Sequence, residues 1–476
     1  MGIVAKAIKS WHAVSKGREF WVGLIVISVV GLSWGGKNLL DSPRPWFDEG
    51  IYLQVAKNVA QEGLWALRVS PQQTVGLEYV TVGFPVILPV AFSIKIFGAS
   101  LLAARGTMLL WIVLGILFGG YLTNRLYGRK AGLVTALFLA SFGPWYANGK
   151  NVMGEVPGLV LMLVSLIFLT KIEKGSRDWQ DFFWLTIFAC LAAVSKPSFL
   201  VLGPAMAFAI VILFWRGFRP TRSSAAAIIT PIVLVSAVWM QTQFGGFPGS
   251  DVLHHYVNPY GLDDVGAVMR QNLIGMFTHS TPLHLLFMLA LIMVALLLRG
   301  WRKTSATEMA MSTVIALTLF SYLRTAGWYR YFFVAQIMCF VLLPIFMTVT
   351  SEKFFKTKRW VPEALFLAMF LSANLFALLR DPSPMFGQDW RKMNAWLEGK
   401  KSVGNIAFIN VPEAVYFYEG SDYRQYLRIT DKLRLGEMDD EAEILMTPNP
   451  LPETIVLPAD YAVSELLGSY AVWRKN

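Results

Sequence analysis

Eleven apolar runs, each close to the length of a bilayer-spanning helix, constrain the fold of this 476-residue chain more than any other feature. A helix needs about 20 apolar residues to cross the hydrocarbon core of a membrane. The composition agrees, because 55% of the residues are hydrophobic and only 15% are charged, against roughly a quarter charged in soluble domains. We therefore expect an all-α polytopic membrane domain. The predicted spans are 20–40, 101–123, 131–148, 155–171, 181–196, 198–215, 224–242, 282–298, 307–323, 331–350 and 361–380.

The stretch 79–97 decides the topology. It has a spanning length, but it contains Pro85, Pro89 and Lys95. Lys and Arg concentrate in cytoplasmic loops, and the N-terminus is basic. If 79–97 does not cross, five basic loops lie inside with the N-terminus; they are 125–130, 171–177, 216–222, 299–303 and 353–359. If it crosses, all five lie outside. We therefore expect 79–97 to form a juxtamembrane helix in the outer interface, with the C-terminus outside.

The net charge of +11 does not indicate a nucleic-acid partner, because the basic residues are scattered in short loops between apolar runs. Cys190 and Cys339 both lie within apolar runs and are expected to pack as small hydrophobic residues. The basic N-terminal segment is followed by a long apolar run without a small-residue cleavage site. This pattern indicates an uncleaved first span rather than a signal peptide.

The composition changes after Arg380. Residues 381–476 hold 15 acidic and 10 basic side chains, with several turn-forming prolines. Residues 403–409 and 454–457 have the pattern of strands, and residues 388–397 have that of a helix. We therefore expect two domains, a membrane domain over 1–380 and a small soluble α/β domain over 381–476 that lies outside the membrane.

The first outer loop, 41–100, contains two adjacent carboxylates, Asp48 and Glu49. Charged side chains near lipid are costly and are commonly functional. One interpretation is a general base, since a carboxylate within hydrogen-bond reach of a hydroxyl can remove its proton. A metal or amine ligand is another, and an acidic helix N-terminus is the structural alternative. Tyr52, with the aromatic residues before Asp48, fits an interfacial aromatic belt under each interpretation.

Three charged residues stand at short outer turns between spans. Lys150 and Glu155 lie at the junction of two spans, where Glu155 either caps a helix or points a carboxylate into the same cavity as Asp48. Lys196 is flanked by long apolar runs. A lysine at such a turn suits an anion such as phosphate, and the alternative is a side chain that extends to the outer headgroups.

Two further outer segments contain cations and aromatic rings. Arg324 and the pair Arg330 and Tyr331 occupy one turn, where they either clamp a phosphate or sugar or form an interfacial aromatic anchor. His255 follows another histidine in the loop 243–281, where solvated loop residues are the default interpretation. The sequence contains no phosphate-binding glycine loop, Cys-X-X-Cys pair or serine nucleophile elbow. Carboxylates and cations on one side of a membrane suit a reaction in which an acid activates a hydroxyl and cations hold a departing phosphate.

A first span, an Asp-Glu pair in an outer loop, a juxtamembrane helix and many further spans together resemble the GT-C superfamily of integral membrane glycosyltransferases. The resemblance covers roughly residues 20–380. The chain is most similar to the bacterial aminoarabinose transferases that modify lipid A and to protein O-mannosyltransferases. The resemblance implies transfer of a sugar from a polyprenyl-phosphate carrier on the outer face, with inversion of the anomeric centre.

The resemblance also implies roles for individual residues. Asp48 matches the catalytic aspartate of the first loop, and Glu49 is its partner. Glu78, in the segment 77–84, matches a possible metal or substrate ligand. Glu155 matches a second acidic residue of the family, and Lys196 matches a lysine implicated in binding the carrier phosphate. His255 falls near an outer-loop histidine of the family, and Arg330 and Tyr331 resemble its Arg/Lys-Tyr pair.

The sequence departs from the aminoarabinose enzymes at two places. Ile51 stands where those enzymes have an arginine, and Tyr79 and Val80 replace a lysine and a proline. These differences weaken an assignment to aminoarabinose or lipid A and leave the general class intact.

We therefore expect an inverting glycosyltransferase of the bacterial inner membrane, with its active site and C-terminal domain outside. The expected partners are a polyprenyl-phosphate-sugar donor, membrane lipids, and a lipid, glycan or protein acceptor. A divalent metal ion between Glu78 and another ligand would help, but the spacing of the residues does not demand a metal or another cofactor. The alternative is a transporter or flippase. The charges cluster at one face and a soluble domain follows the spans, whereas transporters commonly have related halves and midplane sites.

Overall fold

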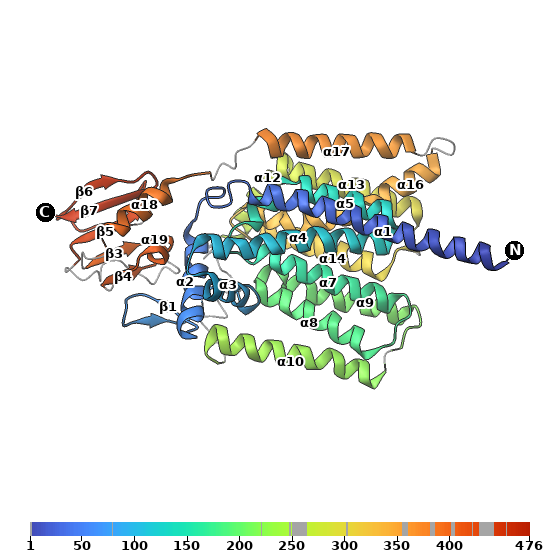
Figure 1. Cartoon of the computed structure of the whole chain (residues 1–476), viewed down its shortest axis with the longest axis horizontal. Helices are drawn as coiled ribbons and strands as arrows, with labels where there is room; N and C mark the ends of the chain where they lie inside the picture. Colours follow the sequence, from blue (N-terminus) through green and yellow to red (C-terminus); the bar gives the residue numbers. More distant parts are fainter. Residues whose placement is uncertain are drawn as a thin grey trace.

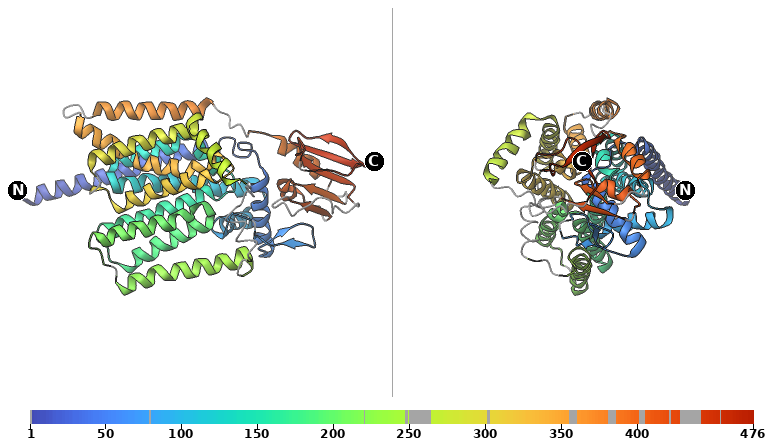
Figure 2. Two further views of the ribbon diagram at one scale, coloured as in Figure 1. Left: turned by 180° about the vertical axis from the view of Figure 1, so that it is seen from behind. Right: turned by 90° about the vertical axis from the view of Figure 1, so that its left-hand side faces the viewer.

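The computed structural model describes residues 2–78, 80–219, 221–246, 249, 264–300, 303–354, 360–380, 386–400, 405–420, 422–427, 442–453 and 455–476. They form a bundle of long helices and a small sheet domain at one end of the bundle (Figure 1). The long helices run side by side, and the N-terminus lies at the end opposite the sheet domain (Figure 2). The mostly helical class predicted from the sequence is confirmed.

Eight helices of the described chain are long and apolar enough to cross a membrane, and each coincides with a predicted span. They are α1 (Gly2–Gly36), α4 (Leu101–Tyr127), α7 (Glu155–Glu173), η1 (Pro197–Val201) with α9 (Leu202–Trp215), α10 (Arg222–Phe244), α13 (Ser280–Arg299), α14 (Ala306–Leu323), and the helix Tyr329–Thr350, which joins η3 (Tyr329–Phe332), α15 (Phe333–Leu342) and the start of α16 (Pro344–Phe354).

The other three predicted spans correspond to helices outside this set of eight. The predicted span 131–148 is divided into α5 (Arg129–Ser141) and α6 (Gly143–Gly149). The division occurs because Pro144, in the first turn of α6, has no N–H to continue the hydrogen bonds of α5. The predicted spans 181–196 and 361–380 correspond to α8 (Trp179–Ser195) and α17 (Trp360–Arg380), which run alongside the long helices (Figure 1).

Residues 41–100, predicted to form the first outer loop, fold at the end of the bundle that faces the sheet domain (Figure 1). They contain α2 (Phe47–Glu62), an antiparallel hairpin of β1 (Leu67–Arg68) and β2 (Thr74–Val75), and α3 (Phe84–Phe97). The predicted interfacial helix 79–97 corresponds to α3, which has 14 residues and is shorter than a span requires. A further helix that the sequence analysis did not predict, α12 (Val265–Thr278), precedes α13.

The C-terminal part of the chain forms a five-stranded mixed sheet with two helices. The strand order is β4-β3-β5-β7-β6, with β3 parallel to β4 and β5, and β7 antiparallel to β5 and β6. The predicted helix 388–397 and strand 403–409 correspond to α18 and β3, whereas residues 455–457 form no strand and Thr454 lies outside the described residues. The elements are α18 (Asp389–Glu398), β3 (Ile406–Ile409), α19 (Pro412–Phe417), β4 (Tyr423–Tyr426), β5 (Ile444–Pro448), β6 (Tyr461–Leu466) and β7 (Tyr470–Lys475).

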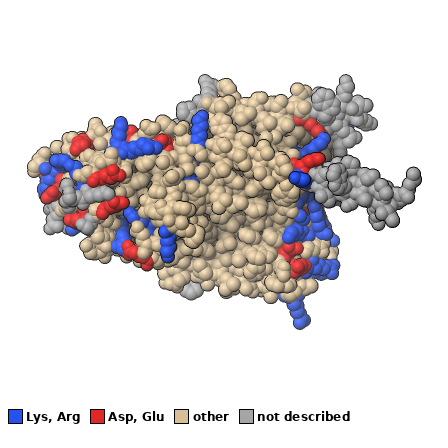
Figure 3. Space-filling model, in the orientation of Figure 1, with Lys and Arg blue, Asp and Glu red and all other residues tan. Residues whose placement is uncertain are grey.

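The charged side chains on the surface are separated from the apolar ones along the length of the molecule. On the face seen in Figure 3, charged side chains gather at the two ends of the molecule, and the band around the bundle between them contains other residues. Basic side chains predominate at the end opposite the sheet domain (Figure 3). The exposed residues of the bundle include many large apolar side chains, such as Trp215, Leu297 and Val233. This pattern is the one expected of a protein surrounded by lipid.

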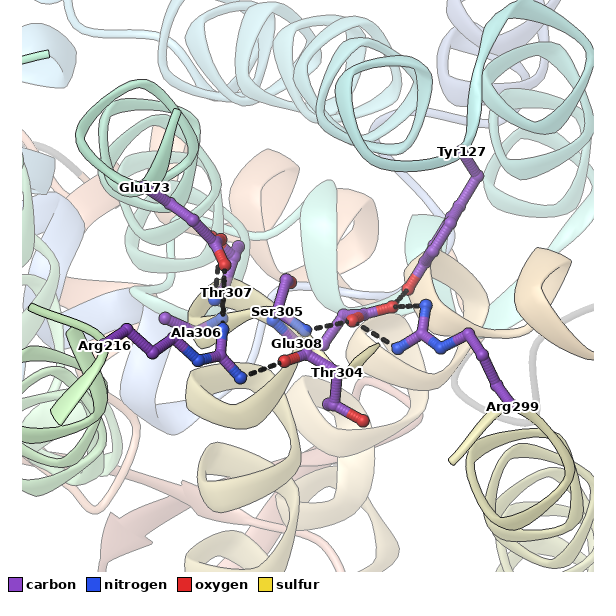
Figure 4. A network of polar contacts seen from close by, with 9 residues as sticks. All are labelled: Tyr127, Glu173, Arg216, Arg299, Thr304, Ser305, Ala306, Thr307 and Glu308. Atoms are coloured by element: carbon purple, nitrogen blue, oxygen red, sulfur yellow. Dashed lines mark hydrogen bonds and ion pairs between the residues drawn. The ribbon is translucent and has the colours of Figure 1, made fainter. Parts of the chain in front are cut away.

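At the end opposite the sheet domain, a polar network joins the ends of α4, α7, α13 and α14 (Figure 4). Glu308 accepts hydrogen bonds from Arg299 at 2.9 and 2.6 Å and from the Tyr127 hydroxyl at 2.6 Å. It also completes a capping box with Ser305. Glu173 accepts hydrogen bonds from the first backbone N–H groups of α14. Because carboxylates hold both the side chains and the helix start, these helix ends are fixed relative to one another.

Candidate active site

Asp48 and Glu49 lie in the first turn of α2 and face different surroundings. Residues that follow each other in a helix point about 100° apart. Asp48 is 29% exposed at its side chain, whereas Glu49 is completely buried. The N-terminal turn of α2 favours both charges, because its backbone N–H groups point toward them.

Glu49 is held by a fully buried arginine of α4. Its two oxygens accept hydrogen bonds from Nε and NH2 of Arg105 at 2.9 and 2.6 Å, and Oε1 also accepts the backbone N–H of Val152 at 3.1 Å. Arg105 donates its remaining bonds to the carbonyls of Leu39 and Pro43 at 2.7 and 2.8 Å. Buried charges are tolerated when every polar atom is satisfied in this way. Since protein groups engage both oxygens, we assign Glu49 to the support of Asp48 rather than to contact with a substrate.

Asp48 faces Arg330, which lies in η3 at the start of the last long helix. Oδ2 of Asp48 lies 3.6 Å from NH1 of Arg330. The guanidinium of Arg330 lies over three aromatic rings, at 5.1 Å from Trp46, 4.6 Å from Trp328 and 5.4 Å from Tyr331. Rings at these distances hold a cation in place. Nε of Arg330 is buried and meets no hydrogen-bond acceptor within the described ranges.

Glu155 and Lys196 form a second buried pair. Glu155 opens α7, Lys196 ends α8, and Oε1 of Glu155 accepts a hydrogen bond from Nζ of Lys196. The pair requires a close approach of the two helix ends at Gly154, where a Cβ atom would lie 2.3 Å from the carbonyl oxygen of Ser195. Oε2 of Glu155 is buried without a partner in the part of the chain that the structure describes.

The two pairs belong to one electrostatic cluster. Burial raises the pKa of Asp48 above its usual value, the charges of Arg330 and Lys196 lower it, and the charge of Glu155 raises it. Tyr52, one turn after Asp48, is buried with its hydroxyl 3.0 Å from Oγ1 of Thr81. Burial, and then the charge of Asp48, raise the pKa of Tyr52. Two carboxylates, two cations and a phenol from distant parts of the chain therefore meet at one end of the bundle.

The other predicted site residues are more scattered. Lys150 donates a hydrogen bond to the carbonyl of Lys37 at 2.6 Å, and burial, with the charges of Arg105 and Lys37, lowers its pKa to about 8. It therefore lies on the side of the Glu49 and Arg105 pair. Arg324 is exposed just after α14. Glu78 lies between β2 and α3, and His255 lies outside the described residues.

The sequence reasoning missed Arg105 and Asn151 as members of this region, and it placed Trp46 in an interfacial aromatic belt rather than under Arg330. An arginine inside the apolar run 101–123 is itself a signal, because an intramembrane charge requires a partner, but nothing in the spacing identifies Glu49 as that partner. Oδ1 of Asn151 is buried and lacks a hydrogen bond from any described residue.

The described residues do not present a built metal site. Within the ranges that the structure describes, no group of three or more His, Cys, Asp or Glu side chains is close enough to hold an ion. Asp48 and Glu155 each face a cation of the protein instead. We derive no chemical step through a metal, and the role predicted for Glu78 stays a prediction.

Comparison with known proteins defines the class of this fold. The model of the family described as dolichyl-phosphate-mannose-protein mannosyltransferase matches residues 86–240, about a third of the chain. A search of curated proteins found no match. The fold is that of the GT-C glycosyltransferases, as predicted, and it resembles that of the aminoarabinose transferase and mannosyltransferase groups.

Three solved structures illustrate the likeness. ArnT from Cupriavidus metallidurans, bound to undecaprenyl phosphate, has a TM-score of 0.59 at 12% identity, covering 97% of this chain and 98% of that one. The oligosaccharyltransferase AglB from Archaeoglobus fulgidus, in complex with an inhibitory peptide and a dolichol-phosphate, has a TM-score of 0.56 at 12% identity, covering 91% of this chain and 70% of that one. The mycobacterial arabinofuranosyltransferase AftD has a TM-score of 0.57 at 14% identity, covering 96% of this chain and 40% of that one. At these identities the likeness establishes the fold.

Proposed function

We propose that this protein is an inverting glycosyltransferase that moves a sugar from a polyprenyl-phosphate carrier to an acceptor hydroxyl or phosphate. The observation that carries the proposal is the position of Asp48, a partly exposed carboxylate that faces Arg330 and Lys196 within a GT-C fold. The neighbours in structure support the donor class, since ArnT binds undecaprenyl phosphate and AglB binds a dolichol-phosphate.

Asp48 acts as the general base in this proposal. It takes the proton of the acceptor hydroxyl while the hydroxyl oxygen forms a bond to the anomeric carbon of the sugar. The bond between that carbon and the carrier phosphate breaks, and its electron pair leaves with the phosphate. The products are the inverted glycoside, the carrier phosphate and a protonated Asp48. Burial raises the pKa of Asp48, which makes its ionised form a stronger base than an ordinary aspartate.

Arg330 and Lys196 stabilise the negative charge that grows on the departing phosphate. The transition state has positive character at the sugar ring, so a site with carboxylates near the ring and cations near the phosphate matches it. The two cations also limit repulsion between Asp48 and the carrier phosphate. Nε of Arg330 and Oε2 of Glu155, both buried and unpaired within the described residues, provide a donor and an acceptor for the substrate.

The same proposal assigns the topology. The eight helices, the pair α5 and α6, and the helices α8 and α17 make eleven spans, with α3 in the outer interface. The 17-residue α8 is about 26 Å long, close to the roughly 30 Å of the hydrocarbon core. Basic side chains gather at the end opposite the sheet domain (Figure 3), which supports placing that end in the cytoplasm and the active site and sheet domain outside the bacterial inner membrane.

The variant Asp48→Asn tests the function. The membrane lipids and surface glycans of cells with and without the chain are compared by mass spectrometry, which identifies the transferred sugar. The purified protein is then assayed in vesicles with the corresponding lipid-linked donor. We expect Asp48→Asn to lose transfer by at least about 1,000-fold, the upper part of the range for a general base, while carrier phosphate still binds. Wild-type turnover by this variant would exclude Asp48 as the base. Movement of the intact donor across the bilayer without sugar transfer would instead support a flippase.

A further inference from the structure

The helix that carries Asp48 is in direct contact with the C-terminal domain. At Gly50, two residues after Asp48, a Cβ atom would lie 2.2 Å from the backbone nitrogen of Glu413 and 2.7 Å from the carbonyl carbon of Pro412. These distances are far shorter than any van der Waals contact, so only glycine allows α2 and α19 to approach this closely. The backbone of α2 and the first turn of α19 therefore lie against each other.

Buried amides extend the contact by one turn of α2. Nε2 of Gln54 donates to the carbonyl of Pro412 at 2.6 Å, and the amides of Gln54 and Gln425 exchange hydrogen bonds at 2.9 and 3.1 Å. Gln425, on β4, also donates to the carbonyls of Arg68 and Val69 at 2.9 and 2.6 Å. A buried amide is costly unless it is satisfied, so this network fixes the register of the sheet domain on α2 and on the segment that follows it.

The segment that leads into α2 is held by the same domain. Asp41 accepts hydrogen bonds from the side chains of Trp390 and Arg391 on α18, at 2.9 to 3.2 Å. Arg44 donates to the hydroxyl of Ser469. Hydrophobic residues of α2, α3 and one face of the sheet domain form a continuous core, in which Leu53 and Val55 pack in the same cluster as residues of α19 and the central strands. The other face of the sheet has a separate cluster. The sheet domain and the catalytic helix are therefore one packing unit.

Glu413 lies in this contact, with its backbone beside Gly50. Its Oε1 accepts a hydrogen bond from the Tyr470 hydroxyl at 3.2 Å, and no other residue of the described chain donates to its Oε2. Burial raises the pKa of Glu413 to about 7, with a smaller increase from the charge of Glu49 and a decrease from that of Arg44. The first turn of α2 thus contacts Arg105 of α4 through Glu49 and the backbone of α19 through Gly50.

We infer that the C-terminal domain is a positioning element of the active site. It presses α2 against Arg105 through Gly50, Gln54 and Glu413, and this contact sets the direction in which Asp48 faces Arg330 and Lys196. The inference rests on the proposed function, since it assigns to the sheet domain a part in the same reaction. Glu413 is its positioning residue, and the domain is required even for acceptors that do not touch it.

The variant Gly50→Ala tests this inference, with Gly106→Ala on α4 as the matched control. A Cβ atom at Gly106 meets nothing within 4 Å, so the control adds the same methyl group without a contact. We expect Gly50→Ala to lower kcat by about 10- to 100-fold, the range for a catalytic group displaced by about 1 Å, with the KM for the lipid-linked donor within about 2-fold. Hydrogen–deuterium exchange of residues 47–56 should increase in Gly50→Ala and not in Gly106→Ala. Equal kcat and equal exchange in the two variants would overturn the inference.

A second variant, Glu413→Gln, keeps the volume and an acceptor for Tyr470 but cannot ionise. The pKa of Glu413 is raised in the docked domain, so docking is strongest at low pH and weakens as the pH rises from about 4.5 to about 7. The ratio of kcat in Glu413→Gln to wild type should therefore rise by about 3-fold or more between pH 5.5 and pH 8. The ionisation of Asp48 affects both proteins and cancels in the ratio.

A constant ratio over this range would remove Glu413 from the positioning contact. A different experiment tests the proposed function, so its failure can be distinguished from failure of this inference. If Asp48→Asn transfers sugar as the wild type does, the general-base assignment falls, whereas the exchange data for residues 47–56 still decide whether the sheet domain holds α2.

Discussion

Removing the charge of Glu49 should destabilise the folded protein, whereas removing the charge of the adjacent Asp48 should not. Glu49→Gln keeps the shape of the side chain but removes the charge that Arg105 faces. Both side chains of this pair are completely buried, and solvent does not screen the loss. Breaking a buried ion pair costs roughly 3–5 kcal/mol, because the remaining charge is left without compensation. A loss of about 4 kcal/mol corresponds to nearly a 1,000-fold shift in the unfolding equilibrium.

Asp48→Asn should cost little or no stability. Asp48 is partly exposed and lies 3.6 Å from Arg330, and burial raises its pKa, so the folded protein gains little from its charge. Equilibrium unfolding in mixed micelles, by titration with sodium dodecyl sulfate, measures both variants against the wild type. We expect Glu49→Gln to unfold at a lower concentration of sodium dodecyl sulfate than the wild type, and Asp48→Asn to unfold at the same concentration as the wild type. Only Asp48 performs the chemistry in our proposal.

A double-mutant cycle completes the measurement. Arg105→Met alone should also destabilise, since it leaves the buried carboxylate of Glu49 uncompensated. The double variant Glu49→Leu with Arg105→Met should cost less than the sum of the separate losses, as expected when two groups interact directly. If Glu49→Gln unfolds at the same detergent concentration as the wild type while Asp48→Asn is destabilised, our division of roles between these two residues is refuted.

Two further predictions concern cations and the opposite end of the bundle. Lys196→Ala should raise the Kd for undecaprenyl phosphate by about 10- to 100-fold, the effect of a lost charge-assisted hydrogen bond, as measured by calorimetry in nanodiscs; unchanged affinity would remove Lys196 from the phosphate site. Glu308→Gln should lower the free energy of unfolding by about 1.5–3 kcal/mol, since Glu308 accepts bonds from Arg299 and Tyr127. Its KM for the donor should not change, and a large increase in KM would show that the two ends of the bundle are coupled.

Much of the fold follows from local sequence features. The apolar runs located all eight long helices, because the bilayer imposes a length and a composition on each span. The distribution of basic loops predicted that residues 79–97 do not cross the membrane, and these residues correspond to the short helix α3. The division of 131–148 into α5 and α6 was not predicted, although Pro144 was visible, because helices in lipid tolerate proline and its effect depends on the neighbouring helices.

The candidate site was only partly predictable. Residue type and outer-loop position selected Asp48, Glu155, Lys196 and Arg330, which the structure brings into one cluster. The separate function of Glu49 was not visible, since its partner Arg105 lies 56 residues away in an apolar run. The contact of Gly50 with Glu413 was equally hidden, because close packing of distant backbones leaves no periodic signal in the sequence.

The polar network at the end opposite the sheet domain has a consequence for how a long isoprenoid chain reaches Asp48. Glu308 and Glu173 join the helix termini there by charge-assisted hydrogen bonds, which makes separation of those termini costly. In the topology that we propose, lateral entry of a lipid should therefore separate the helices at the outer leaflet, with the inner-leaflet ends serving as the hinge.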